Sequence, residues 1–342
     1  MLTYLYLILG VTIFLLTFSD FLITVFSPKG AGIITEKVNT YGSKFYSFVV
    51  GRKGTNTLLD YKVIFLIVSI IVIWITLIWL SCFLVFMSNP NSIIDSDTKL
   101  NASSLDKFYF TGYTLSTLGP GDYKPNGDIW KLFTNLCSFF GFFLISICIT
   151  YIVPLVSNIT KAKALSLKIS GLGESLSELL INSFNGESFE ELTNQFSSLS
   201  DEILTYATNH LAYPILHQVH NSNREENIIL KLASLDEALN IFIYLIPDEY
   251  NNNPLGLQQV RRAISTYLKT LKNLKPSEKA PPIPDLSALQ KSVPIDFLHT
   301  DPKQLQAIYS QIELRMKLHN SNLEKDGWKW EDIVTDYYME FK

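Results

Sequence analysis

The chain has 342 residues, of which 47% are hydrophobic and 18% charged, and its formal net charge is −4. This mild acidity argues against nucleic-acid binding through bulk positive charge. All three cysteines fall within long apolar runs, so we expect neither a disulfide framework nor a cysteine-based zinc site. Residues 1–157 carry the apolar runs, whereas residues 160–342 have the composition of an ordinary soluble domain, and the length fits about two domains.

The first apolar run, Leu2–Phe26, is long enough to span a bilayer. It has neither the basic start nor the small-residue cleavage site of a signal peptide. We therefore predict a membrane helix within residues 1–28, followed by a linker over residues 29–61. Within this linker, Val38–Val50 mixes basic and aromatic residues, so it is either an interfacial helix on the inner leaflet or a plain connection.

Two further runs, Val63–Met87 and Leu132–Val156, contain no charged residue and are also long enough to cross a membrane. Between them, the amphipathic segment Ser103–Ser116 is too short to span and leads into a Gly-Pro-Gly turn. The order of span, short re-entrant helix, glycine-rich loop and span is that of a pore-loop cation channel. We therefore expect a pore domain over residues 62–160.

The loop Thr117-Leu-Gly-Pro-Gly-Asp122 resembles the potassium-channel filter Thr-Val-Gly-Tyr-Gly-Asp, with one departure at Pro120. In that family, rings of backbone carbonyls from four copies of the loop replace the hydration shell of the ion. Glycines allow the alternating backbone conformations that aim these carbonyls at one axis. The resemblance implies a homotetramer with potassium ions in the filter and no other cofactor. Its ion-coordinating positions would be Thr117, Leu118, Gly119, Pro120 and Gly121.

The same resemblance, which covers about residues 60–160, assigns roles to residues around the loop. Tyr109 and Phe110 take the places of the aromatic pair in the pore helix, and Asp122 follows the last filter glycine. Gly141 takes the place of the hinge glycine of the inner helix, where an interior glycine softens a helix. Pro154, near the end of the last span, either bends that helix and shapes a gate or ends the helix.

Pro120 leaves three functions open. Proline keeps its carbonyl but has no N–H, fixes φ near −65° and lacks the aromatic ring that packs the filter in the family. The favoured function is a potassium-conducting channel, and the alternatives are a non-selective monovalent cation channel and a non-conducting, membrane-anchored receptor or signalling subunit. No nucleophile–base pair, phosphate loop or paired-carboxylate motif stands out, so we do not expect an enzyme.

Charge predicts the orientation. Residues 28–62 hold six Lys or Arg against two acidic residues, whereas the loop 89–106 holds three Asp against one Lys. The positive-inside rule then places the linker and everything after residue 158 in the cytoplasm and the N-terminus outside, in a multi-pass protein of the cell membrane. Asp20 lies inside the first span, and because a buried charge is expensive there, we expect it to reach the interface or to form a salt bridge.

The domain over residues 161–342 is predicted to be helical, which makes the whole chain all-α. The glycines at 171 and 173 lack the third glycine and the preceding strand of a dinucleotide-binding domain. A domain of this size next to the last span is expected to regulate the pore, with an unidentified cytoplasmic ligand. Helices are expected over residues 174–184, 188–199, 201–219, 225–247, 254–274, 286–292, 301–320 and 328–341.

Three histidines in this domain, His210, His217 and His220, would share one face of a continuous helix. Such a trio is able to bind zinc or to titrate near neutral pH. Pro214 lies between them and weakens this geometry by kinking the helix. The favoured interpretation is that they are structural histidines, with a metal site or a pH-sensing site as the alternatives.

Overall fold

The computed structural model describes residues 2–27, 30–184, 189–247, 254–271, 274–284 and 302–334. These residues are largely helical, with one small sheet in which β1 (Ile93–Asp95) pairs antiparallel with β2 (Tyr123–Pro125). The all-α class is therefore confirmed. The chain divides into two compact units, which we call the membrane unit (residues up to Ser43 and Ile64–Val156) and the C-terminal unit (Lys44–Val63 and the residues from Ser157 on).

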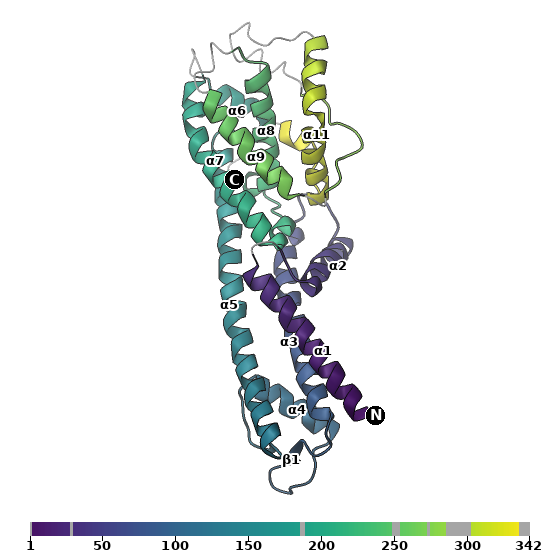
Figure 1. Ribbon diagram of the computed structural model, residues 1–342. Helices are drawn as coiled ribbons and strands as arrows, with labels where there is room; N and C mark the ends of the chain where they lie inside the picture. Colours follow the sequence, from purple (N-terminus) through teal and green to yellow (C-terminus); the bar gives the residue numbers. More distant parts are fainter. Residues whose placement is uncertain are drawn as a thin grey trace. The chain divides into compact units, whose positions relative to one another are not determined.

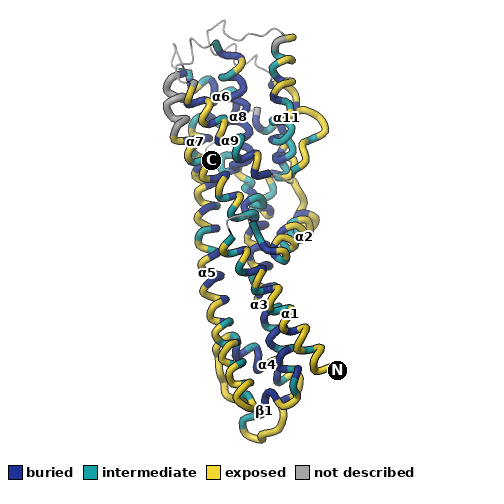
Figure 2. Tube along the Cα trace, viewed as in Figure 1, coloured by how far each residue is buried: buried dark blue, intermediate teal, exposed yellow. Residues whose placement is uncertain are grey.

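Three helices are long and apolar enough to cross a membrane, as predicted. They are α1 (Leu2–Phe26), α3 (Lys62–Met87) together with the 3-10 turn η1 (Thr57–Tyr61) before it, and α5 (Asp128–Ser170). The short helix α4 (Ser104–Leu115) lies between the latter two in the chain (Figure 1). Many of their apolar side chains are exposed on the single chain (Figure 2), as expected for surfaces that face lipid or other chains.

Helix α1 packs against both of the other long helices. A Cβ atom added to Gly10 would lie 2.8 Å from the carbonyl oxygen of Ser81 on α3, so only glycine permits this approach. On the other side, the ring of Phe140 on α5 makes edge contacts with Phe14 and Phe18, at centroid distances of 4.7 Å and 5.4 Å. Helix α1 is thus an integral part of the membrane unit.

Asp20, a residue of α1, is 4% exposed and lies beside the start of α2 (Ile33–Val50). Its carboxylate accepts hydrogen bonds from the backbone N–H of Ile34 at 2.6 Å and from the hydroxyl of Thr35 at 2.8 Å. The indole N–H of Trp74 donates to it at 3.0 Å. Among the described residues no cation pairs with it, so the expected salt bridge was wrong, while its place at the membrane interface stays a prediction. Instead it satisfies the first N–H groups of α2, which lack partners inside that helix.

Helix α5 runs without a break through Pro154, which lies inside it. The alternative that Pro154 ends the helix is therefore wrong. Because proline has no N–H, the carbonyl of Thr150 one turn earlier loses its helical partner. The helix then continues to Ser170, so one unbroken element leads from the membrane unit into the C-terminal unit.

The C-terminal unit is a helical bundle built around one buried helix, α8 (Ile228–Tyr244) (Figure 1). Its leucines Leu232, Leu235 and Leu239 are fully buried. Almost all its other positions are buried too (Figure 2), including several charged ones. The surrounding elements are α6 (Leu176–Asn182), α7 (Glu190–Ala212), η2 (Pro214–Gln218), η3 (Arg224–Glu226), α9 (Pro254–Thr270), α11 (Pro302–Asp326) and α12 (Glu331–Val334).

Several predicted helix boundaries were wrong. Helix α7 is a single helix where the sequence suggested two, and it ends at Ala212 because Pro214 cannot continue it. Helix α11 extends to Asp326, six residues beyond the predicted end at residue 320. The predicted helix over residues 286–292 and the part of the last helix beyond residue 334 lie outside the described residues.

Candidate functional site

The re-entrant helix α4 is fixed at its start by a capping box. The hydroxyl of Ser103 accepts the backbone N–H of Asp106 at 3.3 Å, and the Asp106 carboxylate accepts the backbone N–H of Ser103 at 3.0 Å. Along the helix, Phe110 is 2% exposed and makes an edge contact with Phe86 of α3. Helix α4 is thereby held against α3 through one of its two predicted aromatic residues.

The end of α4 lies against the first third of α5. The hydroxyl of Ser138 donates to the carbonyl of Thr114 at 3.2 Å. One turn further along α5, a Cβ atom on Gly141 would lie 1.8 Å from the carbonyl oxygen of Leu115, a distance that no side chain tolerates. Any side chain at position 141 would therefore collide with the backbone at the end of α4. The role of Gly141 as a hinge stays a prediction.

The loop after α4 has positive φ at every second residue. The φ angles are 58° at Thr117, 55° at Gly119 and 91° at Gly121, whereas Leu118 and Pro120 between them stay in the negative range. Glycine adopts such angles readily. For Thr117 the left-handed region is uncommon, and residues held there cluster at functional sites. This alternation is the backbone geometry that the resemblance to a carbonyl filter predicts.

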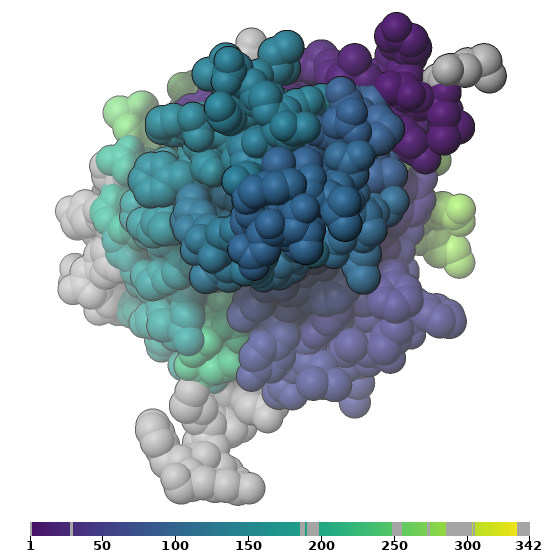
Figure 3. Space-filling model, turned by 90° about the horizontal axis from the view of Figure 1, so that it is seen from below, coloured from purple at the N-terminus to yellow at the C-terminus, as the bar shows by residue number. Residues whose placement is uncertain are grey.

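Every residue from Ser116 to Asp122 is exposed on the single chain. Leu118 is 72% exposed, and a Cβ atom added to Gly119 or Gly121 would meet nothing within 4 Å. Figure 3 shows the molecule from the end that carries β1. In this view, no other part of the chain covers the atoms coloured blue to teal. On a single chain, the side chains of this loop are thus unpacked.

The C-terminal end of the loop is held by residues outside it. Ser96 donates its backbone N–H to the carbonyl of Asp122 at 2.8 Å and its hydroxyl to the carbonyl of Gly121. The hydroxyl of Tyr109 lies 3.5 Å from the Asp122 carboxylate. Tyr113, one turn after Tyr109 on α4, donates to the carbonyl of Tyr123 at 2.8 Å. Sequence reasoning found Tyr109 but missed Ser96 and Tyr113; the four-residue spacing of the two tyrosines was the available signal for Tyr113.

The three predicted histidines do not come together. His210 and His217 have adjacent rings, with centroids 4.6 Å apart. Burial lowers the pKa of His210 to about 4 and the pKa of His217 to about 3, so both are neutral at physiological pH. His220 has other partners, and the described residues contain no group of three or more His, Cys, Asp or Glu side chains placed to hold a metal ion. The continuous helix that would have aligned them ends before Pro214.

His220 joins the linker to the body of the C-terminal unit. Its Nδ1 lies 2.9 Å from the Asp326 carboxylate, and its Nε2 lies 2.9 Å from the carbonyl oxygen of Gly54. Neither partner has a proton to donate, so both ring nitrogens must carry one and the imidazole is charged. Burial lowers the pKa of His220, but Asp326, Asp60 and the Gly54 carbonyl together raise it above its ordinary value. Ser222 adds two hydrogen bonds to Asp60, each of 2.7 Å.

A second ionic cluster lies inside the bundle. The carboxylate of Asp236 on α8 is 2% exposed and pairs with Arg261 at 3.0 Å, with His319 at 3.0 Å and with the guanidinium of Arg315. Burial raises the pKa of Asp236, but these cations outweigh burial and hold it well below its usual range. The neighbouring Glu237 lacks such partners, and burial raises its pKa to about 7. The cluster therefore ties α8 to α9 and α11.

Comparison with known proteins agrees with this geometry. Residues 61–158, which contain α3, α4, the loop and most of the apolar part of α5, match the family described as "Ion channel". The chain is 34% identical over 290 residues to the Bacillus subtilis (strain 168) protein named "Uncharacterized membrane protein YdjJ", and the match covers 84% of each chain. No solved structure matches the chain. The chain is thus a membrane protein that belongs to the pore-loop ion channel family.

Proposed function

We propose that the protein is a homotetrameric cation channel that conducts potassium through the loop Thr117–Asp122. The observation that carries the proposal is the positive φ at Thr117, Gly119 and Gly121, in a loop that is exposed on the single chain. Alternating backbone conformations let successive carbonyls point to one side. Because each chain supplies one loop, four chains are needed to surround an ion, and they would also cover Leu118.

Pro120 supports a second candidate, a channel that conducts monovalent cations without selecting among them. Its N–H is missing, and its ring is smaller than the aromatic side chain that packs the filter in potassium channels. The contacts that hold the loop lie instead at Ser96, Tyr109 and Tyr113. Selectivity for potassium would depend on whether these contacts keep the ring of carbonyls rigid enough.

The C-terminal unit is proposed to lie in the cytoplasm and to regulate the pore. Two covalent connections support this role. Helix α5 continues from the membrane unit to Ser170, and α3 is preceded by the linker that His220 holds at Gly54. A change in the C-terminal unit would act on the pore through these two connections. It would shift the pore toward the open or the closed state only as far as it stabilises that state over the other.

A flux assay on purified protein in liposomes tests conduction. The unaltered protein is expected to pass potassium, with block by barium. A Gly119→Val variant is expected to assemble but to conduct at least tenfold less, because a β-branched residue does not tolerate φ near 55°. If the unaltered protein passes no monovalent cation over a range of pH, the non-conducting receptor is the better assignment.

A further inference from the structure

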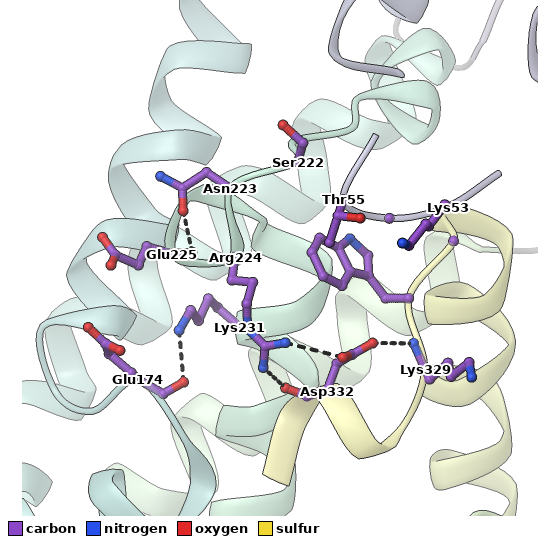
Figure 4. Close-up of a pocket in the computed structure, with 13 residues that line it drawn as sticks. Lys53, Thr55, Glu174, Ser222, Asn223, Arg224, Glu225, Lys231, Lys329 and Asp332 are labelled. Carbon is purple, nitrogen blue, oxygen red and sulfur yellow. Dashed lines mark hydrogen bonds and ion pairs between the residues drawn. The ribbon is translucent and has the colours of Figure 1, made fainter. Parts of the chain in front are cut away.

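A cavity of about 610 Å³ lies entirely within the C-terminal unit (Figure 4). The linker residues Lys53–Thr55 form one wall, and the segment Ser222–Glu225 forms another. The remaining walls come from Glu174, from Lys231 on α8 and from residues 327–332 between α11 and α12. This volume is typical of sites for small organic ligands, which occupy roughly 300–1,000 Å³.

Three lysines line this cavity, of which Lys53 and Lys329 are exposed and Lys231 is buried. Among the described residues none of them has a carboxylate within ion-pair distance. Lys231 is 2% exposed, and its Nζ donates to the neutral main-chain carbonyl of Glu174 at 2.9 Å. Glu174 and Glu225 act on this ammonium group only from beyond ion-pair distance, and burying an ammonium group without a direct ion pair is expensive. Burial lowers the pKa of Lys231 to about 8, so the group still carries its proton at neutral pH.

The guanidinium of Arg224 and the indole ring of Trp328, which both line the cavity, already have partners within the chain. Arg224 pairs with the Asp332 carboxylate at 3.1 Å and also donates to the Asp332 main-chain carbonyl. Its guanidinium lies 5.8 Å from the centre of the Trp328 ring, and Trp328 is 3% exposed. A ligand would therefore be recognised by the lysine charges rather than by an arginine fork or by stacking on the indole. Lysines bind phosphate in this way, as point charges.

The charges of the cavity are separated. Figure 4 shows Glu174 and Glu225 on the side of Lys231, with Lys53 and Lys329 on the opposite side and the Arg224–Asp332 pair between them. After that pair is set aside, three ammonium groups face two carboxylates. Burial, together with the nearby Glu225, raises the pKa of Glu174 above its ordinary value. The carboxyl side suits hydroxyl or amino groups of a ligand, and the opposite side suits an anionic group.

We propose that this cavity binds a phosphate-bearing metabolite of about nucleotide size, with its phosphate toward Lys53 and Lys329 and its hydroxyl or amino groups toward Glu174 and Glu225. The volume exceeds what inorganic phosphate fills. Because Lys53 belongs to the linker before α3, a bound phosphate would stabilise the contact of the linker with the rest of the unit. The binding stands by itself, whereas its effect on conduction rests on the proposed channel function.

Isothermal titration calorimetry on the full-length protein in detergent, at fixed ionic strength, tests binding. The probes are ATP, AMP, tripolyphosphate and adenosine. ATP and AMP are expected to bind saturably, tripolyphosphate more weakly and adenosine at least tenfold more weakly than AMP.

Lys329→Gln is expected to weaken ATP binding about tenfold or more. Lys269→Gln, which removes an exposed lysine outside the cavity, is the matched control and should leave the affinity within twofold. Glu225→Gln should tighten tripolyphosphate binding, since it removes a repelling charge.

The absence of saturable binding by every phosphate probe would overturn the proposal. It would also be overturned if Lys329→Gln and Lys269→Gln weakened ATP equally, which would show nonspecific attraction by surface charge. Flux measured on the same preparations separates this inference from the channel function. Flux without binding removes the ligand site and leaves the channel, whereas binding without flux supports the site and removes the channel.

Discussion

The His220 imidazole bridges the carboxylate of Asp326 and the carbonyl oxygen of Gly54, with 2.9 Å to each. These partners lie 106 and 166 residues away in the sequence. The bridge needs both ring protons, so it is complete only when His220 is charged. A histidine in this state makes the attachment of the linker to the C-terminal unit dependent on pH near neutrality.

The pH dependence of this bridge has a definite sign. The folded-state pKa of His220 is raised above its ordinary value of 6.5, so its stabilisation is complete below pH 6.5 and is lost as pH rises through the folded-state pKa. The charged groups that face it are Asp326 and Asp60. We expect His220→Gln to lower the midpoint of thermal unfolding by a few degrees at pH 6 and by much less at pH 9. A pH-independent difference would contradict the charged bridge.

The stabilisation by His210 should depend on pH in the opposite direction. Its pKa is lowered to about 4, so its contribution is present above pH 6.5 and is lost as pH falls from 6.5 toward 4. A His210→Gln variant should therefore differ most from the unaltered protein at neutral pH and least in acid. The two variants are expected to show crossing pH profiles in the same unfolding assay.

Two adjacent acidic residues on α8 should respond differently to neutralisation. Asp236→Asn leaves Arg261 and Arg315 half-buried without their counter-ion, and it is expected to reduce the free energy of unfolding by about 3–5 kcal/mol. Glu237→Gln should cost less, about 1–2 kcal/mol, because the pKa of Glu237 is near 7 and an amide oxygen still accepts from Tyr309, although the hydrogen bond from Asn240 to the second oxygen is lost. Chemical unfolding of both variants at pH 7 measures the difference. Equal losses would show that Asp236 is not the centre of the ionic cluster.

Gly141 is expected to be essential for packing. Gly141→Ala places a methyl group against the carbonyl of Leu115 at the end of α4, so it should displace the loop, reduce flux at least tenfold and destabilise the assembled protein. Gly171→Ala is the control, since a Cβ atom there would lie 3.5 Å from its nearest neighbours. Retained assembly with altered opening would instead support the predicted hinge at Gly141. Flux together with native mass spectrometry distinguishes the two.

The proposed orientation predicts which sites a membrane-impermeant thiol reagent reaches in intact cells. Cysteines introduced at Thr3 and Asp97 should be labelled, and a cysteine at Lys53 should not. All three positions are exposed on the chain, and the three native cysteines are buried, so access across the membrane decides the result. Labelling at Lys53 without prior permeabilisation would reverse the orientation.

The membrane unit was largely predictable because its signals are local. Apolar run length located the three spans, and the order Thr117 to Asp122 located the strained loop, where glycine has a clear conformational role. Asp20 was not predictable in the same way, since its donors at Ile34 and Thr35 become available only once α2 starts beside it.

The C-terminal unit shows where sequence patterns mislead. The spacing of the three histidines favoured one shared helix face. The helix that carries His210 ends before Pro214, so His217 and His220 lie beyond it and do not share its face. The partners of His220 come from segments distant in the chain, and so do those of Asp236. Long-range pairing of charged groups leaves no periodicity in a single sequence, so these clusters had to be read from the fold.

The most direct test of the channel assignment is the reversal potential of the purified protein in a planar bilayer, with potassium on one side and sodium on the other. The proposed carbonyl pathway through Thr117, Gly119 and Pro120 predicts a cation current whose reversal potential lies far from zero, with the sign expected for a pore more permeable to potassium than to sodium. A reversal potential near zero would support the non-selective pore that Pro120 suggests. The absence of any cation current from an assembled, correctly folded protein would contradict the account.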